Sequence, residues 1–229
     1  MTKPVCAVVG IGPGNGEAFA RAFHEKGYAL AMMSRSTDLS GQLAEEFGDS
    51  GAYACDAGNP DSIIAAFGQA RSDLGPIDTL IYNAGSGSWK SVEELSVEDF
   101  QRGWQINALG ALVAAQQVIP DMKSKGSGNI VFVGATASLR GMPMTAGFAP
   151  AKAAQRILAQ SMARDLGPQG IHVAVLILDG QVGEPDSEAV HDGTKLDPRD
   201  VAAAAYGITQ QPVSARSFEI DLRPMKEKW

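Results

Sequence analysis

Short apolar runs alternate with longer amphipathic segments along the whole chain. The apolar runs predict buried strands at residues 5–9, 29–33, 79–83, 129–134 and 171–178, with shorter candidates at 51–55 and 218–222. Such nearly continuous apolar runs are typical of parallel strands that are covered on both faces. The amphipathic segments predict helices at 14–26, 39–47, 61–73, 97–122 and 150–166.

Helix start signals support this pattern. Asn59, Ser96 and Asp197 can each cap a first turn, and proline follows Asn59 and Asp197 directly. Residues 181–196 contain glycines, a proline and several acids, which predicts a loop or flap. The alternation of strand and helix predicts an α/β fold with three layers, in which a doubly wound parallel sheet of about seven strands spans residues 1–229 as a single domain.

Composition excludes several classes of partner. The 229 residues carry a net charge of −7, so nucleic acid is not expected to bind. No apolar run approaches the roughly 20 residues that span a bilayer, so no membrane contact is expected. The two cysteines, Cys6 and Cys55, lie in separate apolar runs without metal-ligand spacing. This usage predicts buried thiols, no metal and a cytoplasmic location.

A glycine-rich loop follows the first predicted strand and precedes the first predicted helix. Gly10, Gly12, Gly14 and Gly16 lie within seven residues, with Asn15 before the last. Glycines let a pyrophosphate approach the main chain, and a helix N-terminus attracts its charge. The context therefore predicts a dinucleotide site of the Rossmann type, and the alternative is a turn without a ligand.

The spacing of Gly10, Gly14 and Gly16 resembles that of the short-chain dehydrogenase/reductase family. Asn83-Ala84-Gly85 after the fourth strand and Lys152 in the last long helix match further motifs of that family. The resemblance implies that residues 83–85 brace the sheet beside a nicotinamide cofactor and that Lys152 holds its ribose hydroxyls. It covers nearly the whole chain.

The same resemblance assigns further positions. Asp56, followed by Ala57, matches the acid that contacts the adenine, and Asn107 matches an asparagine that positions an active-site water. We also expect the cofactor to contact Gly180 and Val182 after the sixth strand. Lys152 and Asn107 are thereby the candidate catalytic residues.

The end of the second strand indicates which cofactor binds. Ser34 stands where relatives that prefer NAD carry an acid, and Arg35 follows it. Since a guanidinium suits a ribose 2′-phosphate, the sequence predicts NADP(H) in preference to NAD(H). Arg35 as a solvated charge, with Asp38 binding the ribose, is the alternative.

Two positions depart from the family pattern. Phe148 stands where the family has its proton-donating Tyr, and Ala135 stands where it has the Ser that orients the substrate oxygen. Nearby hydroxyls exist at Thr136, Ser138 and Thr145. A positioned general acid typically contributes ~10²–10⁴ in rate, so ordinary carbonyl reduction is expected to be severely impaired.

The segment after the sixth strand also departs from the family. Asp179 and Glu184 stand near positions where relatives have Pro-Gly and a Thr that contacts the nicotinamide. Loss of constraint in a loop is favoured over a new acid–base role, because acids in loops are commonly solvated. The segment is short, so the helices that cover the substrate in relatives are expected to be reduced.

These features leave two hypotheses. The first is an oxidoreductase that transfers hydride to or from a small apolar carbonyl or activated alkene by an atypical mechanism. The second is an inactive NADP(H)-binding sensor or partner subunit. The resemblance also implies a homodimer or homotetramer, supported by apolar positions on two helices: Ala111, Leu112, Ala114, Ala115, Val118, Ile157, Leu158 and Met162. Trp89, Met142, Met144 and Phe148 suggest an apolar pocket, and they suit core packing equally.

Overall fold

The computed structural model describes residues 3–228 and contains one seven-stranded parallel sheet. The strands are β1 (Val5–Val9), β2 (Ala29–Ser34), β3 (Gly51–Ala54), β4 (Thr79–Tyr82), β5 (Gly128–Ala135), β6 (Ile171–Leu178) and β7 (Glu219–Leu222). Their order is β3-β2-β1-β4-β5-β6-β7, and every neighbouring pair is parallel. The predicted doubly wound α/β fold is confirmed.

The order of strands reverses between β1 and β4, which makes their carboxyl ends a topological switch point. Val9 pairs with Met33 on one side and with Tyr82 on the other, so the loops after all three strands begin at one level. Ligands of open α/β sheets bind at such a point.

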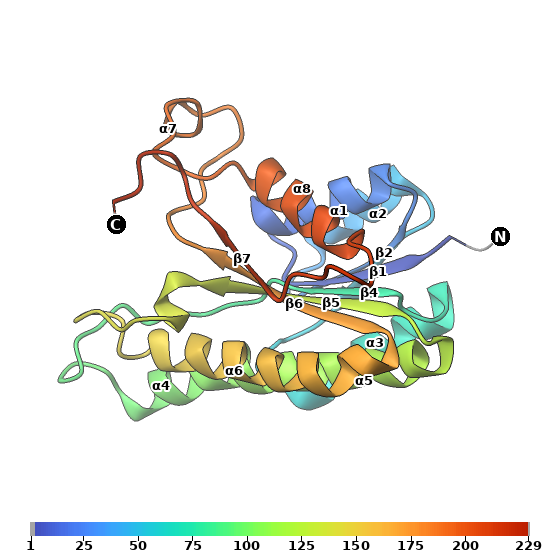
Figure 1. Cartoon of the computed structure of the whole chain (residues 1–229), viewed down its shortest axis with the longest axis horizontal. Helices are drawn as coiled ribbons and strands as arrows, with labels where there is room; N and C mark the ends of the chain where they lie inside the picture. Colours follow the sequence, from blue (N-terminus) through green and yellow to red (C-terminus); the bar gives the residue numbers. More distant parts are fainter. Residues whose placement is uncertain (1–2, 229) are drawn as a thin grey trace.

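Helices cover both faces of the sheet, as Figure 1 shows. One face carries α1 (Asn15–Glu25), α2 (Asp38–Phe47) and α8 (Pro198–Thr209), and the other carries α3 (Pro60–Leu74), α4 (Val97–Trp104), α5 (Gly110–Lys125) and α6 (Ala149–Leu166). Each face has its own apolar cluster, with Phe19 and Phe23 on the first and Phe67 and Phe132 on the second. The three predicted caps form: Asn59, Ser96 and Asp197 each accept a hydrogen bond from a backbone N–H of the following turn.

The predicted helix at 97–122 is not continuous. It divides into α4, a π-helical turn at Gln105–Leu109 and α5. The turn is held by its surroundings, because the Tyr82 hydroxyl donates to the Ile106 carbonyl over 2.6 Å. A Cβ on Gly110 would lie 2.2 Å from the Ala57 carbonyl oxygen, so the chain passes here in close contact with its neighbours.

The predicted flap at 181–196 contains regular structure. A single turn of helix, α7 (Glu188–His191), stands beyond the carboxyl ends of the strands near the C-terminus (Figure 1). Val182 bridges Leu196 in parallel, and Leu196 is buried. Between β6 and α8 the helical cover is therefore limited to this one short turn.

The prediction that two helices carry surplus apolar surface for an oligomer interface is wrong for most of the residues named. Ala111, Ala114, Ala115, Val118 and Met162 are buried within this chain, because α5 and α6 pack against the sheet. Ile157 does remain exposed. Cys6 and Cys55 are buried free thiols, and burial raises the pKa of Cys55 to about 11. Within residues 3–228, no helix is both long and apolar enough to cross a bilayer.

Candidate cofactor and substrate site

Three adjoining cavities lie at the carboxyl ends of the strands, and Asn83 lines all three. We call them the Arg35 cavity (about 300 Å³), the glycine-loop cavity (about 1060 Å³) and the Phe148 cavity (about 750 Å³). Every residue predicted to bind the cofactor lines at least one of them: Gly10, Gly12, Gly14, Asn15, Gly16, Ser34, Arg35, Asp56, Ala57, Asn83, Ala84, Gly85, Lys152, Gly180 and Val182.

The glycine loop is packed tightly on one side and open on the other. A Cβ on Gly10, whose φ is +99°, would lie 2.6 Å from the Ala84 nitrogen, and a Cβ on Gly16 would lie 2.5 Å from the Gly10 oxygen. By contrast, a Cβ on Gly12 would meet nothing within 4 Å. The Asn83 side chain donates to the Gly10 carbonyl over 2.8 Å. No side chain caps the first turn of α1, so the loop presents main chain to its cavity.

The Arg35 cavity is lined by two exposed arginines, Arg35 from the loop after β2 and Arg102 from α4. Arg35 forms no hydrogen bond or ion pair with any residue from 3 to 228. The Ser34 hydroxyl proton already has a partner, because it is donated to the Ser36 carbonyl over 2.6 Å. Asp38 does not line the cavity, and its carboxylate accepts from the Ser36 hydroxyl over 2.7 Å. Arg35 is therefore the charged group of the β2 loop that is available here.

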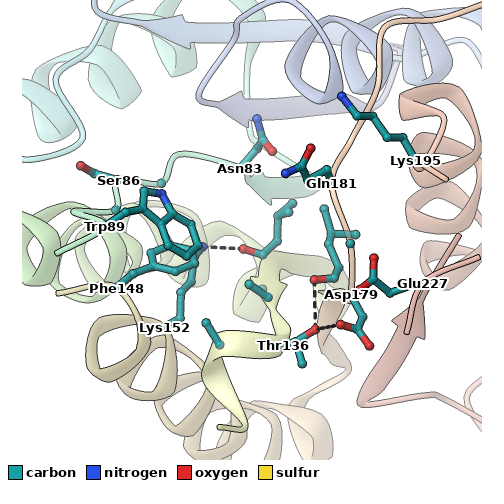
Figure 2. A pocket seen from close by; sticks show the side chains of 18 of the residues that line it. Asn83, Ser86, Trp89, Thr136, Phe148, Lys152, Asp179, Gln181, Lys195 and Glu227 are labelled. Atoms are coloured by element: carbon teal, nitrogen blue, oxygen red, sulfur yellow. Dashed lines mark hydrogen bonds between the residues drawn. The ribbon is translucent and has the colours of Figure 1, made fainter. Parts of the chain in front are cut away.

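Lys152 is a buried cation in the Phe148 cavity. Its side chain from α6 is 4% exposed. Nζ donates to the Val133 carbonyl over 2.8 Å (Figure 2) and to Gln155 Oε1 over 3.1 Å. Burial lowers the pKa of Lys152 to about 8. Since an ammonium has three N–H groups, one remains for a ligand.

Asn107 lies behind the cavities and lines none of them. It belongs to the π-helical turn and is fully buried, and its amide donates to the Ser86 and Gly103 carbonyls over 2.6 and 2.8 Å. Its Oδ1 has no partner within the described residues. A Cβ on Gly85 would lie 3.4 Å from this oxygen and 3.6 Å from Lys152 Nζ, so Gly85 leaves a gap between the two polar groups.

Two apolar residues replace the hydroxyls expected beside Lys152. Phe148 and Ala135 both line the Phe148 cavity. Phe148 packs against Trp89 with ring centroids 5.4 Å apart, and its centroid lies 5.9 Å from Lys152 Nζ. Trp89 is 63% exposed. This wall of the cavity is aromatic, and Lys152 is the titratable group beside it, whereas the Trp89 indole N–H can donate a hydrogen bond but not a proton.

Of the three hydroxyls considered from sequence, Thr136 alone lines the Phe148 cavity. Ser138 and Thr145 line a separate cavity beside Met142. Thr136 Oγ1 donates to Asp179 Oδ1 over 2.6 Å (Figure 2). Asp179 is 5% exposed and forms an ion pair with Arg223. It is therefore a buried, paired carboxylate and not the solvated loop acid expected from sequence. Glu184 lines the glycine-loop cavity instead.

Five polar residues of the Phe148 cavity were not predicted: the hydroxyl residues Ser86 and Thr194, and the three longer side chains of Gln181, Lys195 and Glu227. Lys195 lines the glycine-loop cavity as well, and its amino group points to that side (Figure 2). Glu227 comes from the segment after β7, close to Asp179 in Figure 2. None of the three belongs to a recognisable motif, and each reaches the cavity through tertiary structure.

Comparison with known proteins identifies the family to which the chain belongs. The family model described as short chain dehydrogenase matches residues 4–182, and the chain belongs to the short-chain dehydrogenase family. An uncharacterized oxidoreductase of Staphylococcus aureus (strain N315) is 27% identical over 232 residues, which cover 98% of this chain and 99% of that protein.

Solved structures agree. A short-chain dehydrogenase from Rhodopseudomonas palustris has a TM-score of 0.84 and 33% identity, with 96% of this chain and 98% of that chain covered. An alcohol dehydrogenase from the archaeon Thermococcus sibiricus, solved with 5-hydroxy-NADP, has a TM-score of 0.87 and 26% identity, with 98% of each chain covered.

Proposed function

We propose that this chain is an NADP(H)-dependent oxidoreductase that acts on a small, largely apolar substrate without the Tyr–Ser pair of its family. The observation that carries the proposal is the set of three cavities that meet at Asn83 at the switch point and are lined by Arg35, by the glycine loop and by Lys152. A dinucleotide needs an extended site of this kind, with a phosphate cradle in its middle.

The residues present fit the cofactor. Gly12 leaves open space for a pyrophosphate, and the first turn of α1 offers uncapped main chain to it. Arg35 has a free guanidinium for a 2′-phosphate, and Asp56 lines the same cavity. Lys152 keeps one N–H for the ribose hydroxyls, beside the unpaired oxygen of Asn107. When bound, the cofactor would supply or accept a hydride.

The protein side of the chemistry differs from that of its relatives. Phe148 and Trp89 form an apolar wall of the cavity, against which an apolar substrate would pack. Because Phe148 and Ala135 carry no hydroxyl, Lys152 is left as the nearest proton donor on this wall. The mechanism therefore depends on holding the acceptor in place, which is itself a large rate effect.

Two measurements test the proposal. NADPH and NADH affinities are determined by titration calorimetry, and NADPH oxidation is followed with a panel of ketones, enones and imines. We expect NADPH to bind at least about tenfold more tightly than NADH, as one charge-assisted phosphate contact provides. Failure to bind either nucleotide would refute the function.

The alternative is a non-catalytic cofactor-binding protein, and the apolar residues at 135 and 148 favour it. It predicts NADPH binding with no turnover of any panel member above the protein-free background. Saturable turnover of a single substrate class would support the oxidoreductase proposal over this alternative.

A further inference from the structure

Two polar groups of the Phe148 cavity, the Thr136 hydroxyl and the Glu227 carboxylate, can accept a hydrogen bond from a ligand and cannot donate one to it. Thr136 is the clearest case, because a carboxylate can only accept, so the Thr136 proton is committed to Asp179 over 2.6 Å. Its oxygen lone pairs remain available to the cavity. Asp179 is held in this role by its ion pair with Arg223.

Glu227 adds a full negative charge to the same side. Its carboxylate lines the cavity and forms no hydrogen bond or ion pair with residues 3–228. The segment that carries it is anchored, since the Lys226 backbone N–H donates to the Gly193 carbonyl over 2.8 Å and the Lys226 side chain pairs with Asp192 at 3.2 Å. Pro224 is buried, and a Cβ on Gly180 would lie 2.7 Å from its ring.

The other hydroxyls of the cavity supply no donor. Thr194 donates to the Ala189 carbonyl over 2.9 Å and to Asp192 over 2.8 Å. The Ser86 hydroxyl points away from the middle of the cavity (Figure 2). Gln181 and Lys195 do carry donors: Lys195 also lines the glycine-loop cavity, as Asn83 does, and in Figure 2 the Gln181 amide lies toward Asn83 and away from Thr136 and Glu227. The cavity thus separates cationic groups that suit a cofactor from acceptors that face a substrate.

We infer that the substrate is a protonated imine with an apolar body, and that this site reduces a C=N bond and not a C=O bond. The inference rests on the proposed function. A carbonyl becomes an oxyanion on reduction and needs donors, which Phe148 and Ala135 do not provide. An iminium N–H is a donor that fits the Thr136 oxygen, and its charge fits Glu227. The aromatic pair of Trp89 and Phe148 attracts an organic cation.

The reaction balances without an acid. The iminium carbon accepts a hydride, with its electron pair, from the reduced nicotinamide, and the C–H bond forms as the nicotinamide C–H bond breaks. The π electrons of the C=N bond become the lone pair of a neutral amine. No proton is consumed, so a site that lacks the family's proton donor loses nothing essential to this step.

The first test measures binding without cofactor. Protonated 1,2,3,4-tetrahydroisoquinoline is the probe, and isochroman is its neutral oxygen isostere. We expect calorimetry to give an affinity for the ammonium at least about tenfold higher, as one charge-assisted hydrogen bond provides. Glu227→Gln and Thr136→Val should each remove most of this preference, whereas Thr136→Ser should keep it. Glu188→Gln, an acid of α7 outside the cavity, is the matched control and should change nothing.

The second test measures turnover with NADPH. We expect 3,4-dihydroisoquinoline to exceed 1-tetralone in kcat/KM by about 100-fold or more, the typical contribution of the missing general acid. Glu227→Gln should lower the imine value while leaving the NADPH affinity unchanged. Equal or faster reduction of the ketone overturns the inference, as does equal binding of ammonium and isochroman.

The outcomes separate the inference from the function on which it rests. If NADPH binds and an enone or ketone is the better substrate, the inference fails and the oxidoreductase stands. If NADPH binds and no substrate turns over, the inference fails and the non-catalytic alternative holds. If no nucleotide binds, the proposed function fails, and the inference fails with it.

Discussion

The two halves of the site differ in how closely they keep the family pattern. At the β1–β4 side, Gly10, Gly16 and Asn83 fit one another so tightly that a single added carbon would collide with main chain. At the β5–β6 side, Phe148 and Ala135 stand where the family resemblance implies reacting hydroxyls, while Asp179, which is paired with Arg223, and Glu227 line the same cavity. The proposed function thus assigns cofactor binding and proton chemistry to separate parts of the sheet, and it predicts that one can change without the other.

Restoring the lost hydroxyls should change the second half most. The double variant Phe148→Tyr with Ala135→Ser places donors beside Lys152, on backbone positions that already line the cavity. We expect ketone reduction to rise by about 10²-fold or more, since that is the lower range for a positioned acid. Steady-state kinetics with 1-tetralone measure it.

The same variant provides its own control. Imine reduction should stay within a few-fold of the parent, because hydride transfer to an iminium needs no donor. NADPH affinity should also be unchanged, since the glycine loop and Arg35 are untouched. A double variant that gains imine reduction in parallel with ketone reduction would contradict the separation of the two halves.

In the first half, substitution of Gly10 should destabilise the fold, and substitution of Gly12 should weaken NADPH binding. Gly10→Ala places a side chain at φ +99° and 2.6 Å from the Ala84 nitrogen, which should cost about 3 kcal/mol of stability. Such a loss lowers Tm by roughly 6–12 °C in a chain of this size, as scanning calorimetry can measure. Gly12→Ala is the matched control for stability, because its Cβ would meet nothing within 4 Å.

Gly12→Ala should instead affect binding alone. The added methyl group stands in open space beside the glycine-loop and Arg35 cavities, where we place the pyrophosphate. Loss of the close main-chain contacts should raise the Kd for NADPH about tenfold or more. An unchanged Kd would show that the phosphates lie elsewhere.

Sequence predicted those parts of the molecule whose causes are local. The glycine loop, the caps at Asn59 and Ser96, and the spacing from Phe148 to Lys152 are all set within one or two neighbouring elements. The π-helical turn around Asn107 was not predicted, because it depends on the Tyr82 hydroxyl reaching the Ile106 carbonyl from another element.

Long-range contacts explain the remaining differences. Asp179 could be interpreted as a loop acid until Arg223, from the segment after β7, was seen to pair with it. Glu227 lies outside the region that resembles the family model and reaches the cavity through the anchoring of Lys226. The helix faces around Ala114 and Ala115 looked like surplus apolar surface, and they are buried because α3 and the sheet cover them.

Lys152 is expected to contribute to both halves of the site, and the pH dependence of NADPH binding should show its contribution. Its pKa is lowered to about 8 by burial, so the ammonium predominates below that pH and is lost as the pH rises. We expect the Kd for NADPH to rise above about pH 8 as the charge disappears. Lys152→Met should weaken binding by roughly 10- to 100-fold at pH 7 and abolish this pH dependence.

Stability supplies an independent check on Lys152. Its folded pKa lies below the ordinary value of 10.5, so the unfolded chain binds more protons between about pH 8 and 10.5. The free energy of unfolding should therefore rise with pH across that window through this group. In Lys152→Met this contribution should disappear, and denaturant titrations at several pH values measure it. An identical slope in both proteins would show that Lys152 is not the buried titrating group.

The smallest change concerns the choice of cofactor. Arg35 is exposed, so water screens its charge, and Arg35→Ala should raise the Kd for NADPH about tenfold and leave NADH unchanged. Arg140→Ala, another exposed arginine that lines none of the three cavities, is the matched control. The competing account has Asp38 bind a free ribose, although its carboxylate accepts from Ser36 and does not line the Arg35 cavity. That account requires NADH to bind at least as tightly as NADPH and Asp38→Ala to weaken it, and equal affinities in the parent protein would decide against Arg35 as the selecting residue.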